Sequence, residues 1–63
     1  MQTRAARVKN TRTRILEAAY QLFLERHYDE VSLERVAERA GLSKQTVIRQ
    51  FGSKDRLAYA VVD

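Results

Sequence analysis

Hydrophobic residues recur at helical spacing along most of the chain. In the first segment, from about residue 11 to residue 26, apolar side chains fall at i, i+4, i+7 and i+8, which is the pattern of a helix with one buried stripe. That stripe consists of Ile15, Ala19, Leu22 and Phe23. Leu16 lies at its edge, whereas Tyr20 and Leu24 point away from it. The pattern therefore predicts a scaffold helix with two apolar side chains on its outer face.

A second amphipathic helix is predicted over Leu33–Ala40, where apolar residues follow i, i+3, i+4 and i+7 spacing. Ser32 can cap this helix, because its hydroxyl can accept a free amide proton of the first turn. Gly41 can end the helix, because glycine adopts the left-handed conformation at little cost. Ahead of the helix, we expect Tyr28 and Val31 to close the core beneath a short connection.

A third, shorter helix should follow the turn at Gly41 and Leu42, with Ser43 as its cap. At 100° per residue, Val47 and Phe51 fall together on one side of this helix. The other side offers hydrogen-bonding groups and no acidic side chain, from Gln45, Thr46, Arg49 and Gln50. Two short helices joined by a three-residue turn with glycine form a helix-turn-helix.

Gly52 should stop the third helix, and Ser53 can cap a fourth. Leu57, Ala60 and Val61 would face inward from that helix. The chain reaches Asp63 within an apolar run, so we expect the fourth helix to belong to something longer. The predicted fold is all-α: a three-helix bundle with a homeodomain-like helix-turn-helix, plus the start of a fourth helix.

Charge is distributed unevenly over the 63 residues. The first fourteen contain five basic side chains and no acidic one, whereas the remainder contains seven basic and eight acidic ones. We interpret residues 1–10 as a basic flexible arm and residues 11–63 as the helical domain. Such an arm favours contact with nucleic acid through phosphate neutralisation and counterion release. The alternative is a solvated leader that only aids solubility.

Composition argues against several kinds of site. The absence of cysteine excludes disulfides and thiolate metal sites, and it suits a reducing cytoplasm. The single histidine, His27, has no second histidine or cysteine with which to share a metal, so we predict neither metal nor cofactor. Nothing supplies a nucleophile, a base and a cavity together, so we predict no enzyme activity. No apolar run approaches the roughly 20 residues that span a bilayer, and we expect no membrane partner.

The polar side of the third helix suits a DNA major groove. Arginine can form paired hydrogen bonds with guanine and glutamine with adenine, which makes Gln45, Arg49 and Gln50 the candidates for base contacts. An ordinary surface helix with a solvated polar face is the simpler alternative for so short a stretch.

Four motifs occur in order: Arg14-Ile15-Leu16-x-Ala18-Ala19-x-x-Leu22-Phe23, Tyr28-x-x-Val31-Ser32, Val36-Ala37-x-x-Ala40-Gly41-Leu42-Ser43-Lys44 and Phe51-x-Ser53-Lys54-x-x-Leu57. Together they closely resemble the DNA-binding domain of TetR-family transcriptional regulators. The resemblance implies a bacterial, cytoplasmic, nucleoid-associated repressor that binds a palindromic double-stranded operator as a homodimer. It also implies a helical C-terminal domain, absent from this chain, for dimerisation and a small-molecule inducer. A transcriptional activator and a helical protein-interaction module remain alternatives.

The resemblance also implies individual contacts. Lys44, Thr46 and Lys54 match positions where the family commonly meets DNA, and Lys54 should meet a phosphate at the start of the fourth helix. Ser32 and Ser43 could add phosphate contacts to their role as caps. Basic residues of the arm could enter a minor groove or stay near phosphates. The full predicted set is Arg4, Arg7, Lys9, Ser32, Ser43, Lys44, Gln45, Thr46, Ile48, Arg49, Gln50 and Lys54.

Four positions depart from the family pattern. His27 stands where glycine usually ends the first helix, so that helix must end in another way or place His27 in a left-handed conformation. Gln45 replaces a small residue. Ile48 and Gln50 replace the usual tyrosine and histidine, and Ile48 could either contact a thymine methyl group or pack. The operator sequence is therefore not transferable from relatives.

Overall fold

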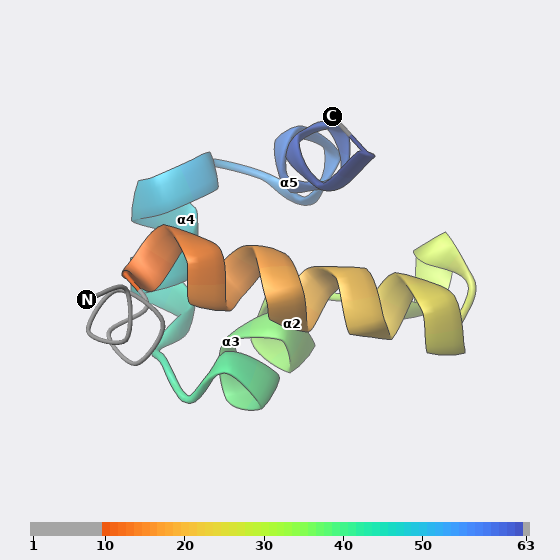
Figure 1. Ribbon diagram of the computed structural model, residues 1–63, viewed down its shortest axis with the longest axis horizontal. Coiled ribbons are helices and arrows are strands. Elements are labelled where there is room, and N and C mark those ends of the chain that lie inside the picture. Colours follow the sequence, from red (N-terminus) through yellow and green to blue (C-terminus); the bar gives the residue numbers. More distant parts are fainter. Residues whose placement is uncertain (1–9, 63) are drawn as a thin grey trace, which may run out of the picture.

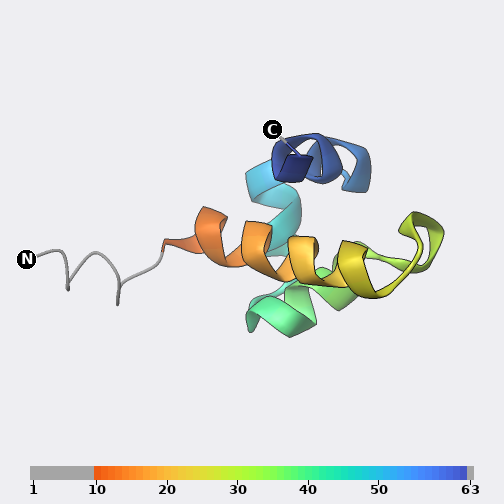
Figure 2. The same cartoon turned by 45° about the vertical axis from the view of Figure 1, so that its right-hand side comes forward.

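The computed structural model describes residues 10–62, and these residues form helices and connections without a strand. The elements are α2 (Thr11–Glu25), the short 3-10 helix η1 (Tyr28–Glu30), α3 (Leu33–Ala40), α4 (Lys44–Phe51) and α5 (Lys54–Val62). In Figures 1 and 2, α3 and α5 lie on opposite sides of α2, and α4 joins them near the beginning of α2. The predicted all-α fold, with a helix-turn-helix and a fourth α-helix, is confirmed.

Helix α2 is capped at its beginning by a side chain and ends without a glycine. At the beginning, the side chain of Asn10 accepts a 2.8 Å hydrogen bond from the amide of Thr13, so Asn10 is the N-cap of the helix. At the end, Arg26 is extended, with φ −137° and ψ 161°, and its amide donates to the carbonyl of Leu22. His27 is also extended, with φ −66°. The helix therefore ends without a left-handed residue.

The connection after α2 is closed by only one of the two expected residues. Val31 is buried, whereas Tyr28 is 39% exposed, so the expectation that Tyr28 would close the core was wrong. Its ring instead stacks on Phe23 at the surface, with the centroids 5.7 Å apart. The phenol then reaches the carboxylate of Asp55, to which it donates a hydrogen bond. A tyrosine hydroxyl needs a hydrogen-bond partner when its ring is packed against other side chains. This requirement favours a surface position for Tyr28 over a position in the core.

The turn between α3 and α4 follows local rules. Gly41 has φ 75° and ψ 32°, the left-handed conformation expected at this position. The amide of Leu42 donates to the carbonyl of Ala37 at 2.8 Å, which closes the end of α3. Ser43 then caps α4, because its hydroxyl accepts the amide proton of Thr46 at 3.2 Å. The direction of α4 is thus set by one glycine and one serine.

The core lies where the helices converge. Its buried members are Ile15, Ala18, Ala19, Leu22, Val31, Val36, Ala37, Ala40, Val47, Phe51 and Leu57. Leu33, Phe23, Ala60 and Val61 pack against this core but are only partly buried. Tyr20 and Leu24 are exposed, as expected for the outer face of α2. Among residues 10–62, no helix has the length and apolarity needed to cross a membrane.

Candidate nucleic-acid interface

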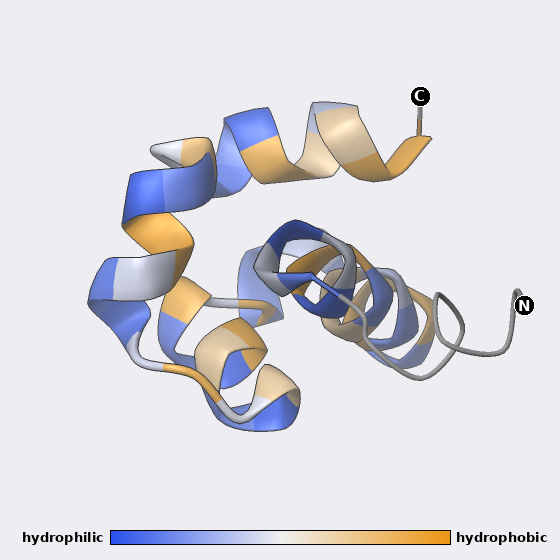
Figure 3. Cartoon of the chain, turned by 60° about the vertical axis from the view of Figure 1, so that its left-hand side comes forward, coloured by the Kyte–Doolittle hydropathy of each residue, from blue (hydrophilic) through white to orange (hydrophobic). Residues whose placement is uncertain are grey.

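The fourth element of the fold, α4, is anchored from one side only. Val47 and Phe51 are buried in the core, as predicted from their spacing. The guanidinium of Arg12 lies over the ring of Phe51, 4.7 Å from its centroid, and ties the beginning of α2 to the end of α4. Figure 3 shows α4 as alternating hydrophobic and hydrophilic bands, as expected for a helix with one inward and one outward face.

The outward face of α4 carries the predicted base-contacting residues. Gln45, Arg49 and Gln50 are exposed, and within residues 10–62 their side chains have no hydrogen-bond or ion-pair partner. Ile48 is 41% exposed, so it lies at the surface beside them rather than in the core. This face therefore combines free donors and acceptors with one apolar side chain. Such a set can bond to base edges and contact a thymine methyl group.

Hydroxyl groups hold the beginnings of both helices of the motif. The hydroxyl of Ser32 accepts the amide proton of Arg35 at 3.1 Å, which confirms its role as the cap of α3. The hydroxyl oxygens of Ser43 and Thr46 are 2.9 Å apart and share a hydrogen bond at the start of α4. Phosphate contacts by Ser32 and Ser43, and a DNA contact by Thr46, remain predictions.

Lys44 already has a partner in the protein. Its Nζ lies 2.8 Å from Oε2 of Glu34, the second residue of α3. The hydrogen bond from Lys44 is the main reason that the pKa of Glu34 is lowered, so the carboxylate is ionised at neutral pH. The sequence pattern did not predict this pair, because two residues that lie ten apart on different helices have no periodic signal.

Lys54 is also engaged within the protein. It begins α5 as expected, but its Nζ donates a 2.9 Å hydrogen bond to the carbonyl of Tyr28 and lies 4.2 Å from the centroid of the Tyr28 ring. The neighbouring Asp55 accepts the hydrogen bond from the Tyr28 hydroxyl, which raises the pKa of Tyr28 to about 12. A phosphate contact by Lys54 would therefore have to compete with Tyr28.

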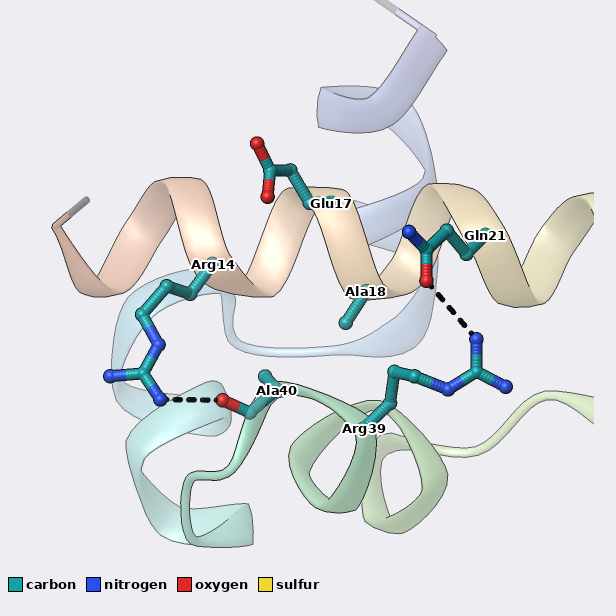
Figure 4. Close-up of a pocket in the computed structure, with 6 residues that line it drawn as sticks. All are labelled: Arg14, Glu17, Ala18, Gln21, Arg39 and Ala40. Carbon is teal, nitrogen blue, oxygen red and sulfur yellow. Dashed lines mark hydrogen bonds between the residues drawn. The ribbon is translucent and has the colours of Figure 1, made fainter. Parts of the chain in front are cut away.

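Two arginines connect α2 and α3 across the hollow drawn in Figure 4. Arg14 donates a 2.8 Å hydrogen bond to the carbonyl of Ala40 at the end of α3, next to the turn. Arg39 donates to Gln21 and forms a 3.0 Å ion pair with Glu25. These contacts set the position of the motif against α2. The sequence pattern had identified Arg14 only as part of a motif, and it had not identified the role of Arg39.

The basic residues predicted for the arm, Arg4, Arg7 and Lys9, lie outside the described residues. Their contribution to binding remains a prediction. Among residues 10–62, no three His, Cys, Asp or Glu side chains gather closely enough to hold a metal ion.

Comparisons with known proteins place the chain among regulators. A family model described as bacterial regulatory proteins, tetR family, matches residues 15–61. An uncharacterized HTH-type transcriptional regulator, YdeS of Bacillus subtilis (strain 168), is 39% identical over 56 residues, which are 86% of this chain and 28% of that protein. An HTH-type transcriptional regulator of Staphylococcus aureus (strain USA300) is 37% identical over 54 residues, with 86% and 29% covered. The chain thus spans less than a third of the length of these relatives. No solved structure matches the chain significantly.

Proposed function

Because the chain belongs to the TetR family of bacterial regulatory proteins, we propose that it is the DNA-reading part of a ligand-responsive repressor. Within this family, the helix-turn-helix is the DNA-binding domain of a transcriptional regulator, and α3, the turn and α4 form that motif here. The observation that carries the proposal is the outward face of α4. Its amide and guanidinium groups are exposed and have no partner within residues 10–62, so they are available to bases.

We propose that the contacts divide by chemistry. Amide and guanidinium groups on α4 read base edges, and Ile48 contacts a thymine methyl group. Hydroxyl and ammonium groups at the helix beginnings meet the phosphate backbone, and the arm follows the adjacent minor groove. The proposed base contacts are Gln45, Ile48, Arg49 and Gln50. The proposed backbone and groove contacts are Ser32, Ser43, Lys44, Thr46, Lys54, Arg4, Arg7 and Lys9.

The length of α4 supports binding as a dimer to a palindromic operator. At 1.5 Å per residue, its eight residues extend about 12 Å, which matches only a few base pairs. One copy therefore reads too short a sequence to select a site in a genome. Two copies related by a two-fold axis would read two inverted half-sites, about one helical turn or a multiple of it apart.

Dimerisation and ligand binding are proposed for the part of the protein beyond this chain. The chain spans 28% of YdeS, so a relative of that length has room for a second, larger domain. Binding of a small-molecule inducer there would change the separation of the two DNA-binding domains of the dimer and release the operator. Such a regulator would work in the cytoplasm, associated with the nucleoid.

Selection of bound duplexes from a random pool, with the full-length protein, tests the proposal. An enriched inverted repeat is the expected result, and enrichment of no sequence would contradict it. Transcription in vitro from a promoter that carries the selected operator separates repression from activation. A helical protein-interaction module would bind an acidic protein instead of DNA. Addition of unrelated duplex DNA tests this alternative, because such DNA would not specifically displace an acidic protein from the module.

A further inference from the structure

An acidic side chain lies at the edge of the candidate interface and holds one of its cations. Glu34 and Lys44 come from the first turns of α3 and α4, and their charged atoms are 2.8 Å apart. Both side chains are open to solvent, with 65% of Glu34 and 48% of Lys44 exposed. DNA that approaches α4 would therefore meet this ion pair rather than a free ammonium group.

We propose that Glu34 is a specificity-determining residue, which weakens binding to random duplex DNA more than binding to the operator. The inference rests on the proposed function. Binding to random DNA derives almost entirely from neutralisation of phosphates by cations. While Glu34 neutralises Lys44, that cation contributes little, and a phosphate must displace the carboxylate to use it. The displaced carboxylate then lies near phosphates that repel it.

The operator can compensate for this cost at a fixed position, whereas random DNA does so only where its sequence places an amino group opposite Glu34. In the major groove, cytosine and adenine each present an amino group that can donate a hydrogen bond to a carboxylate. Phosphates, and the groove-facing oxygens of guanine and thymine, offer only acceptors. In a half-site with an amino group opposite Glu34, that amino group would therefore donate a hydrogen bond to the carboxylate. Lys44 would then be free to contact a phosphate of the DNA backbone.

A second ion pair in the same domain provides a matched control. Glu25 and Arg39 form a 3.0 Å pair between α2 and α3, also with exposed side chains. Glu25 ends α2, at the opposite end of that helix from α4 in Figure 1. Glu25→Gln and Glu34→Gln remove the same charge from the protein and break one ion pair each. Only Glu34→Gln changes the surface beside α4.

The test measures dissociation constants of the full-length protein for the selected operator and for a random duplex, between 50 and 200 mM salt. Glu34→Gln should tighten random binding and steepen its salt slope by about 0.9 unit, the value for one further phosphate contact. The gain should then be about threefold larger at 50 mM than at 200 mM salt. Operator binding should gain less, so the ratio of operator to random affinity falls.

Glu25→Gln should change the dissociation constants for the operator and for the random duplex by the same factor, which leaves the ratio of the two affinities unchanged. The double variant Glu34→Gln/Lys44→Gln should lose the gain on random DNA, because Glu34 acts through Lys44. An equal shift of operator and random binding by Glu34→Gln would overturn the inference while leaving the proposed function intact. A wild-type protein that does not distinguish the operator from random DNA would overturn both.

Discussion

A side chain without a partner in the free protein can bond to DNA without first losing another contact. Arg49 is such a residue, because it is exposed on α4 and has no hydrogen-bond or ion-pair partner within residues 10–62. We predict that Arg49→Ala weakens operator binding by about 1–3 kcal/mol and relaxes the preference at one base pair. Arg49→Lys is the matched control, because it keeps the charge but loses the paired hydrogen bonds to guanine. The measurement is binding to the operator, to single-base variants of it and to random duplex. Equal loss on every duplex would make Arg49 a backbone contact.

The phenol of Tyr28 provides a residue-level test by pH. Its hydrogen bond to Asp55 is the main cause that raises its pKa from 10.0 to about 12. In the unfolded chain the phenol titrates near 10, so the protonated form is favoured by folding. The associated stability is fully present below about pH 10 and is lost as the pH rises towards 12. Tyr28→Phe should therefore unfold with a weaker pH dependence than the wild type in this window. Parallel curves for the two proteins in urea, from pH 9 to pH 12, would contradict the assignment.

At the scale of elements, the turn between α3 and α4 depends on a glycine. Gly41 has φ 75°, and a Cβ at this position would lie 3.1 Å from Nη2 of Arg14, which bonds to the adjacent Ala40 carbonyl. We predict that Gly41→Ala lowers the free energy of unfolding by about 1–2 kcal/mol, the cost of a left-handed residue with a Cβ. Gly41→Asn should cost less, because asparagine tolerates this conformation better. Urea unfolding measures both variants, and equal losses would point to the contact with Arg14 rather than to the backbone.

The elements also show which features a sequence can predict. The bounds of α3 and α4 follow from Ser32, Gly41 and Ser43, because caps and left-handed glycines act within a few residues. The outward face of α4 follows from the positions of Val47 and Phe51 for the same reason. These features were predicted because they are local.

Contacts between distant residues were not predictable in this way. Lys44 meets Glu34 ten residues earlier, and Lys54 meets Tyr28 across 26 residues. The Lys44 contact joins α4 to α3, and the Lys54 contact joins α5 to η1. Helical periodicity carries no information about how these elements pack. The same is true of Tyr28, whose place at the surface depends on a partner in α5. The candidate site was therefore predicted as a set of positions, whereas the partners of its cations in the free protein were not.

At the scale of the whole molecule, the proposed binding as a dimer means that affinity should come from joining two DNA-binding domains. Linking two binding modules can raise overall affinity by about 10²–10⁴, provided that both can engage at once. We predict that the 63-residue chain alone binds a half-site weakly, whereas the full-length protein binds the operator more tightly by a factor in this range. The geometry of DNA supplies the control, because about five extra base pairs between the half-sites turn the second one to the opposite face of the duplex. The affinity of the full-length protein for this DNA should then fall towards that of the single chain. About ten extra base pairs should restore part of the lost affinity. Affinity that is insensitive to this spacing would mean that the two DNA-binding domains do not bind as a rigid symmetric pair.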